Sequence, residues 1–404
     1  MKVAIYAPNY LPAVRYGGPV QSSHGLAKAL VGQGCAVDVF TTDVDGPDRL
    51  DVPLGIPVSI DGVRVRYFPI VAPRRIYRAP AMTAALDRLL PESDILHING
   101  AYLLPGPTAA RIARRHGVPY VHAPRGMLAP DMIAGKSRWV KRAWIASLER
   151  AALRGAAAIH ATADLEAEGL RRLGLDLAPI HVIANGVDMP ARVDTALSER
   201  LWSGMPRGQR VAMLGRLDWM KGMDVAIRAI AHVPGSHLRI AGPDHAGLRP
   251  SLERLAREAG VAERVSFAGL IEGERKWALL AGADVVLVPS LRESFGMTVV
   301  EALAVGTPVI VTEGVGASTI VRRIDPDCVV ERTPQALASA IHRLLGNPAR
   351  RDAIGAAGAA LVSRDYGWDA IAARTIALYR EAIAAGPQRA RRPAQPGHPS
   401  HAGI

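Results

Sequence analysis

Short apolar runs rich in β-branched residues alternate with longer stretches rich in alanine and leucine along most of the chain. The short runs have the length of buried parallel strands, and the longer stretches have the apolar periodicity of helices. This alternation is typical of doubly wound α/β packing. In the first half we predict strands at residues 3–6, 36–41, 95–98, 120–123 and 158–161, and helices that include 20–32, 108–116 and 139–154.

The same pattern restarts after a polar, irregular stretch at about residues 190–208, which is typical of a linker. Beyond it we predict strands at 210–214, 236–241, 264–268, 285–289 and 309–312, and helices at 224–231, 248–259, 274–281 and 298–304.

These elements predict an α/β protein with two Rossmann-like doubly wound domains that face each other across a cleft, one in residues 1–195 and one in residues 205–365. Ligands of such sheets bind at the carboxyl ends of the strands. Residues 366–385 contain a long amphipathic helix that we expect to cross back onto the first domain. Residues 386–404 lack apolar periodicity and predict a disordered tail.

The length and the charge of the chain narrow its class. A chain of 404 residues is too long for one compact core. The net charge of +12 suits anionic ligands or surfaces, although an arginine- and alanine-rich composition can raise the charge without any partner. Cys35 and Cys328 lie far apart in apolar stretches, which predicts buried thiols in a reducing compartment. We recognise no signal peptide or membrane span, so we expect a cytoplasmic location.

Residues 289–302, Pro-Ser-Leu-Arg-Glu-Ser-Phe-Gly-Met-Thr-Val-Val-Glu-Ala, carry the strongest chemical signal. They follow a buried strand and open a helix, so the junction presents free N–H groups and the positive end of the helix dipole, which suits a diphosphate. Glu293 and Glu301 could accept hydrogen bonds from sugar and ribose hydroxyls, respectively. Taken as isolated glutamates, however, a helix cap at Glu293 and a solvated Glu301 are the favoured interpretation.

Residues 214–222, Leu-Gly-Arg-Leu-Asp-Trp-Met-Lys-Gly, carry the second signal. Gly215 ends a strand, so we expect Arg216 to emerge into the cleft and Lys221 to follow on the next turn. A guanidinium and an ammonium group could together neutralise a departing diphosphate, and such stabilisation is often the largest catalytic contribution. Two basic residues on a solvated loop explain this segment equally well when it is taken alone.

Two further strand ends carry candidate residues. Gly17 and Gly18, after the first strand, would let the backbone approach a ligand closely, although a G-x-G-x-x-G fingerprint is missing. His122 and Arg125, in the run His-Ala-Pro-Arg-Gly-Met-Leu, could reach a sugar hydroxyl or a phosphate. A lone histidine at a strand end is more often structural. Asn99 is a further candidate on the acceptor side.

Taken together, the segments resemble family 4 glycosyltransferases of the GT-B fold, over residues 2–380 or so. The residues that carry the resemblance are Glu293-Ser-Phe-Gly…Glu301, Gly215-Arg216-Leu217…Lys221-Gly222, Gly17-Gly18 and Asn185-Gly186-Val187-Asp188. Residues 124–128, Pro-Arg-Gly-Met-Leu, resemble a subgroup found in bacterial surface-polysaccharide assembly, in which histidine often replaces the arginine.

The resemblance implies a retaining hexosyltransferase that uses a UDP- or GDP-linked donor and a glycan or lipid-linked sugar acceptor in surface polysaccharide or lipopolysaccharide biosynthesis. It implies that Glu301 holds the ribose, that Glu293 holds the donor sugar, and that Arg216 and Lys221 bind the diphosphate. The other implied donor contacts are Gly17, Gly18, Ser294, Phe295, Gly296 and Met297, with His122 against the transferred sugar and Arg125 and Asn99 on the acceptor side.

The resemblance implies no cofactor and no metal. Asp43 and Asp45 have the spacing of a metal motif, but we expect them in a solvated early loop. Residues 136–144, Lys-Ser-Arg-Trp-Val-Lys-Arg-Ala-Trp, suit either a peripheral contact with an anionic membrane or an ordinary helix with core tryptophans. We find no nucleic-acid recognition motif. A sugar-nucleotide epimerase of the same fold is the alternative function, and neither donor base, sugar nor acceptor can be read from the residues.

Overall fold

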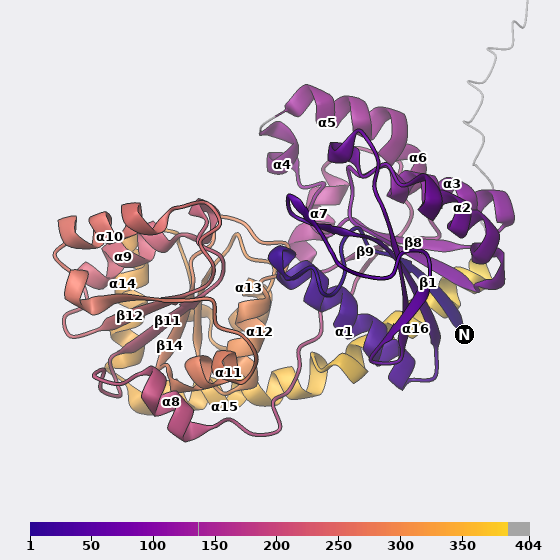
Figure 1. Cartoon of the computed structure of the whole chain (residues 1–404). Helices are drawn as coiled ribbons and strands as arrows, with labels where there is room; N and C mark the ends of the chain where they lie inside the picture. Colours follow the sequence, from indigo (N-terminus) through magenta and orange to yellow (C-terminus); the bar gives the residue numbers. More distant parts are fainter. Residues whose placement is uncertain (136, 387–404) are drawn as a thin grey trace, which may run out of the picture.

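The computed structural model describes residues 1–135 and 137–386, which form two α/β units lying side by side (Figure 1). The N-terminal sheet has the order β10-β9-β8-β7-β1-β2-β6-β5, and its neighbours are parallel except for the β5–β6 pair. Its strands are β1 (Lys2–Tyr6), β2 (Ala36–Thr42), β5 (Pro57–Ile60), β6 (Val63–Phe68), β7 (Ile95–Asn99), β8 (Tyr120–Ala123), β9 (Ala158–Ala161) and β10 (Ile180–Val182), beside a separate ribbon of β3 (Val44–Asp45) and β4 (Asp48–Arg49).

The C-terminal sheet is parallel throughout, with the order β13-β12-β11-β14-β15-β16. Its strands are β11 (Arg210–Leu214), β12 (His237–Ala241), β13 (Val265–Gly269), β14 (Val285–Val288), β15 (Val309–Thr312) and β16 (Val329–Val330). The strand order reverses between β11 and β14. In a doubly wound sheet the loops at this reversal splay apart and leave a crevice, where ligands bind.

Helices flank both sheets. Those of the N-terminal unit are α1 (Gly18–Gly32), α2 (Pro80–Leu89), α3 (Pro105–His116), α4 (Pro130–Ala134), α5 (Arg138–Trp144), α6 (Arg150–Arg154) and α7 (Asp164–Arg171). The helices that follow along the chain are α8 (Thr195–Leu201), α9 (Met223–Ala231), α10 (Arg249–Glu258), α11 (Gly273–Gly282), α12 (Met297–Ala304), α13 (Ser318–Ile324), α14 (Pro334–Leu345), α15 (Pro348–Asp365) and α16 (Trp368–Ala385). The predicted α/β class with two Rossmann-like units is confirmed.

The predicted crossing of the last helix is also confirmed. Ile371, Leu378 and Tyr379 of α16 pack into the core on one face of the N-terminal sheet. The indole of Trp368 lies so close to two glycines that a Cβ would come within 2.2 Å of it at Gly25 and within 2.3 Å at Gly186. Only glycine fits at these positions, so the crossing depends on residues that are far apart in the sequence.

One local prediction is wrong. The stretch at 190–208 is not an irregular linker, because it contains α8, where Asp194 accepts a hydrogen bond from the Leu197 backbone N–H (2.9 Å) and the buried Trp202 donates to the Leu279 carbonyl (3.0 Å). The helix predicted at 139–154 is confirmed, and it contains a π-helical turn at Ile145–Glu149 between α5 and α6.

Other expectations have mixed outcomes. Asp43, expected in solvent, is buried and pairs with Arg49 at 3.1 Å. Cys35 and Cys328 are buried free thiols, as predicted. Among the described residues, no helix is long and apolar enough to cross a membrane. The tail predicted at 386–404 lies outside the described residues, apart from Gly386.

Candidate active site

The two segments with the strongest chemical signals follow β11 and β14, so they meet where the strand order of the C-terminal sheet reverses. They are tied to each other through the backbone, because the Leu291 N–H donates to the Met220 carbonyl at 2.7 Å. Gly222 has φ of 75°, and a Cβ there would come within 2.2 Å of the Pro289 carbonyl oxygen. The two loops therefore form one rigid edge.

Glu293 and Lys221 form an ion pair at this edge. The Lys221 Nζ lies 2.9 Å from Glu293 Oε2, and the Ser290 hydroxyl donates to Glu293 Oε1 at 2.5 Å. The Glu293 backbone is held as well, because its N–H donates to the Gly314 carbonyl at 2.9 Å. Both carboxylate oxygens thus have a donor already, and the side chain is fixed in one orientation.

The N-terminus of α12 follows directly. Gly296 precedes the helix with φ of 98°, and a Cβ at this position would come within 2.5 Å of Val315 Cγ1. Within the described residues, the backbone N–H groups of Phe295, Gly296 and Met297 have no acceptor. These groups lie at the positive end of the helix dipole, which is a ready site for an anion. From the other unit, Gly18 faces this helix, and a Cβ there would lie 3.7 Å from Met297.

Glu301 lies further along α12 and has its own lysine partner. Lys276 Nζ of α11 lies 2.8 Å from Glu301 Oε1, and the ammonium group also lies 4.3 Å from the ring centroid of Trp277. Only 14% of the Glu301 side chain is exposed. Glu301 is therefore neither fully solvated nor buried, and sequence reasoning missed Lys276 because no motif marks it.

Arg216 follows Gly215 at the end of β11 and is exposed. Within the described residues its guanidinium makes no ion pair, in contrast to Lys221. The Lys221 Nζ lies over the Gly215 backbone, since a Cβ at that glycine would be 3.8 Å from it. Two cationic groups, one paired and one unpaired, thus follow the same strand.

The run after β8, in the N-terminal unit, reaches the loop between β14 and α12 in the other unit. Arg125 has φ of 56°, donates from Nε to Asn99 Oδ1 (2.8 Å) and donates from Nη1 to Asn185 Oδ1 (2.9 Å). Its Nη2 is buried without a partner, and burial lowers the pKa of this guanidinium. Gly126 packs on Ser294 so closely that a Cβ would come within 2.5 Å of the serine Cβ. Asn185 was quoted as part of a motif, but its contact with Arg125 was not foreseen.

His122 lies in the interior of the N-terminal unit. Its side chain is fully buried, its Nε2 lies 3.0 Å from the Gly100 carbonyl oxygen, and Nδ1 has no partner. The same Nε2 is 3.5 Å from Oε1 of Glu149, which is also fully buried and accepts from the Trp144 indole N–H at 2.9 Å. The structure therefore places His122 beneath the cleft surface. Asn99 is likewise interior, at 4% exposure.

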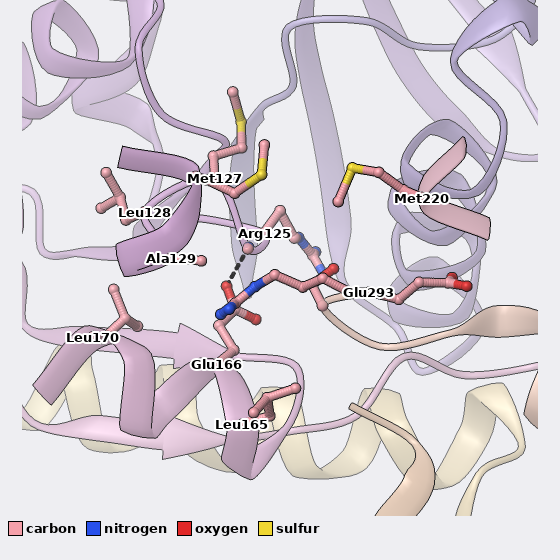
Figure 2. A pocket seen from close by; sticks show the side chains of 13 residues that line it. Arg125, Met127, Leu128, Ala129, Leu165, Glu166, Leu170, Met220 and Glu293 are labelled. Atoms are coloured by element: carbon pink, nitrogen blue, oxygen red, sulfur yellow. Dashed lines mark hydrogen bonds between the residues drawn. The ribbon is translucent and has the colours of Figure 1, made fainter. Parts of the chain in front are cut away.

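A pocket of about 210 Å³ opens between the two units beside Glu293 (Figure 2). One wall is the run from Arg125 to Ala129, and Met220 and Glu293 form the opposite wall. Glu166 holds the first wall, since it accepts from the Gly126 N–H (2.5 Å) and from the Thr162 hydroxyl (2.7 Å). Glu166 is not among the residues predicted from the sequence, because no motif marks it.

Contacts across the cleft join the units in this conformation. Arg292, in the loop between β14 and α12, forms an ion pair with Asp131 at the start of α4. The Thr162 Oγ1 also lies 3.4 Å from the Ser294 carbonyl oxygen. Among the described residues, no three His, Cys, Asp or Glu side chains gather in a way that could hold a metal ion.

The chain is similar to known proteins over nearly its whole length. Residues 17–186 match the model of the glycosyl transferase 4-like domain, and residues 206–360 match the model of the glycosyl transferases group 1. The chain is 33% identical over 396 residues to a D-inositol 3-phosphate glycosyltransferase of Xylanimonas cellulosilytica, which covers 90% of this chain and 91% of the relative.

Solved structures share the fold. The sucrose-phosphate synthase of Thermosynechococcus elongatus superposes with a TM-score of 0.77 at 23% identity, and covers 95% of this chain and 100% of its own. Anabaena HepE in complex with UDP and glucose superposes with a TM-score of 0.74 at 19% identity, and covers 94% of this chain and 99% of its own. The chain therefore belongs to the group 1, family 4 glycosyltransferases of the GT-B fold, which use a sugar-nucleotide donor.

Proposed function

We propose that this glycosyltransferase moves a hexose from a UDP- or GDP-linked donor to a glycan or lipid-linked sugar acceptor, with retention of configuration and without a metal. The observation that carries the donor half is the meeting of three features at one edge: the Glu293–Lys221 pair, the free N–H groups at the start of α12, and the unpaired Arg216. Together they match the charge and the hydroxyl groups of a nucleotide sugar.

The donor is held, in this proposal, by groups of known placement. The diphosphate lies against the N–H groups of Phe295, Gly296 and Met297 and between the cationic groups of Arg216 and Lys221. Glu293 accepts from the sugar hydroxyls. Glu301 accepts from the ribose hydroxyls, in exchange for part of its contact with Lys276. Gly17 and Gly18 close over the donor from the other unit, where a side chain would occupy the same space.

Retention is proposed to occur by substitution on one face of the sugar. A double displacement needs a carboxylate nucleophile. Glu293 suits that role poorly, because both of its oxygens already accept from Ser290 or Lys221. Instead, the bond from C1 to the phosphate oxygen breaks first. The acceptor oxygen then bonds to C1 from the same face, and its proton passes to the departing diphosphate, whose charge Arg216 and Lys221 stabilise.

The proposed acceptor site is supported by a different observation, the pocket beside Glu293. Arg125 and Gly126, whose run resembles that of transferases in surface-polysaccharide assembly, form one wall of the pocket beside Glu293. We assign this pocket to the acceptor and place the reaction in surface polysaccharide or lipopolysaccharide biosynthesis. A lipid-linked acceptor would bring the protein to the inner face of the membrane as a peripheral protein, through the described part of the segment 136–144. His122 acts in this proposal through the backbone at Gly100 and not by touching the sugar.

One assay tests the proposal. The protein is incubated with UDP- and GDP-hexoses, with and without EDTA, and with bacterial membranes as the acceptor. Labelled hexose should pass into lipid-extractable or polymeric glycan at the same rate in both cases, and NMR of the product should show the anomeric configuration of the donor. Loss of transfer with EDTA, or an inverted product, would contradict the metal-independent retaining mechanism.

A further inference from the structure

A second pocket, of about 370 Å³, lies in the N-terminal unit between α4, the π-helical turn and the end of α7. Its apolar lining includes Ile133, Ile145 and Leu173, and Arg142, Arg150 and Arg172 line it as well. The described residues that line it include no acidic side chain. An apolar cavity that three arginines also line suits a ligand with an anionic head and an apolar body.

Within the described residues, no buried ion pair holds these three arginines. In the described part of the chain, neither Arg142 nor Arg150 has a carboxylate partner. Arg172 pairs with Glu168 at 3.5 Å, but both side chains are more than half exposed, so a phosphate can displace this contact. Structural arginines elsewhere in the same unit, such as Arg49 and Arg115, have carboxylate partners instead.

Exposed apolar side chains surround the same region. Trp139 and Val140 of α5 are 65% and 69% exposed, and Met132 of α4 is 39% exposed. The guanidinium groups of Arg138 and Arg142 lie 5.0 and 5.2 Å from the Trp139 ring. An outward tryptophan among cations is typical of a helix that rests at the boundary between lipid headgroups and acyl chains. Helix α5 has no acidic residue to repel an anionic surface.

We propose that this pocket binds one anionic phospholipid of a membrane on which α4 and α5 rest. The lipid phosphate lies among Arg142, Arg150 and Arg172, and the beginning of an acyl chain lies on Ile133 and Ile145. This inference deepens the peripheral membrane association proposed above and rests on it. It adds a defined lipid site, built from three elements, to what would otherwise be a general attraction of charges.

The position of the pocket connects the lipid to the reaction. Helix α4 lies between the two pockets: Ile133 faces the lipid site, and Met132 lines the pocket beside Glu293. Figure 1 shows α4 and α5 at the top of the N-terminal unit, with α4 on the side toward the C-terminal unit. A membrane on this face would therefore bring a lipid-borne acceptor to the edge of the cleft.

Sedimentation with vesicles tests the proposal. The full chain is mixed with vesicles of phosphatidylcholine alone or of phosphatidylcholine with phosphatidylglycerol. The test variant is Arg142→Gln with Arg150→Gln, and the control is Arg254→Gln with Arg257→Gln, which removes the same charge from the exposed face of α10 in the other unit. We expect binding only to the vesicles with phosphatidylglycerol, about tenfold or more weaker in the test variant and unchanged in the control. Free glycerol 3-phosphate at the same phosphate concentration should not displace the protein.

The other outcomes overturn the proposal in distinguishable ways. If the test variant binds as well as the control, the pocket is not a lipid site and α5 alone holds the membrane. If both variants lose affinity equally, the attraction is one of net charge. If the unaltered protein binds neither vesicle, or both equally, the membrane association itself is wrong. A thermal shift with nucleotide on the same preparations reports separately on the donor site, so a failure here leaves the transferase proposal standing.

Discussion

The glutamates in the loop after β14 and in α12 each have a lysine partner: Glu293 pairs with Lys221, and Glu301 pairs with Lys276. At most a quarter of each of these side chains is exposed. Partly buried pairs of this kind hold the carboxylates in one orientation before a ligand arrives. The hydroxyl groups of a nucleotide sugar would therefore meet acceptors that are already in place, and little ordering is left to occur on binding.

Arg216 is expected to act mainly in the transition state, because no ion pair holds its guanidinium within the part of the chain that the structure describes. Replacing Arg216 with alanine should lower kcat by about 10²–10³-fold, as for the loss of one donor to a developing charge. Arg228→Ala, on the exposed face of α9, is the matched control and should leave turnover unchanged. Near-normal turnover in Arg216→Ala would remove this residue from the mechanism.

Glu301 is expected to act in donor binding. Glu301→Gln keeps the shape of the side chain but loses the charge, so its hydrogen bonds to ribose weaken and Lys276 loses its partner. The Kd for the nucleotide, measured by calorimetry, should rise about tenfold to a hundredfold. Lys276→Ala separates the two effects, since it removes the ion pair but leaves the carboxylate. An unchanged Kd in Glu301→Gln would contradict the ribose contact.

At the scale of elements, the start of α12 depends on one glycine. Gly296 has φ of 98°, and its missing side chain leaves room for Val315. Thr298 then ties the first turn to the end of β11, because its hydroxyl donates to the Leu214 carbonyl at 3.1 Å. The free N–H groups of α12 are thereby held at the point where β11 and β14 diverge.

Gly296→Ala should move this helix start. The positive φ and the overlap with Val315 should cost roughly 1–3 kcal/mol of stability and weaken nucleotide binding at the same time. Gly260→Ala is the control, because Gly260 has φ of 67° but open space at its Cβ, so it should cost stability without affecting the nucleotide. Thermal melts and nucleotide titrations of both variants provide the comparison. Normal nucleotide affinity in a folded Gly296→Ala protein would contradict the anion site.

The sequence predicts buried strands and the site loops that follow them better than it predicts contacts between elements. Runs such as those of β11 and β14 are recognisable because both faces of a parallel strand are buried. The short edge strand β16 and helix α8 were missed, since their stability comes from tertiary contacts such as the burial of Trp202. The π-helical turn leaves no periodic signal in the sequence.

The residues of the candidate site were predictable where they lie in short runs of the sequence that follow a predicted strand. Glu293, Lys221 and Gly296 belong to two runs, and the structure brings them to one edge. The structural interpretation of His122 was the more common one for a lone histidine, but its neighbours could not be predicted, because they come from the loop at Gly100 and from Glu149 in the π-helical turn. Lys276 and the contact between Asn185 and Arg125 were missed for the same reason: each residue meets its partner across more than twenty residues of sequence.

At the scale of the whole molecule, the two units meet through few polar contacts at the cleft, among them the Asp131–Arg292 ion pair. Helix α16 joins the units from the opposite direction, since it packs on the N-terminal core. The ion pair stabilises the arrangement of the two units in which Gly18 lies against Met297.

Asp131→Ala should therefore raise KM for the donor and leave kcat nearly unchanged. The effect should be at most about fivefold, since Asp131 is 70% exposed and such pairs contribute about 1 kcal/mol or less. The double variant with Arg292→Ala should be no worse than Arg292→Ala alone if the two residues act as a pair. Additive losses would show that they act separately.

The most direct test of the central claim is a thermal shift of the protein against UDP, GDP, ADP and their hexose conjugates, repeated with Glu301→Ala. We predict that one nucleotide stabilises the unaltered protein, by about 2.7 kcal/mol at a hundred times its Kd, and that the variant loses this shift. The result that would contradict a donor site at α12 is the absence of any shift, or an equal shift in the variant.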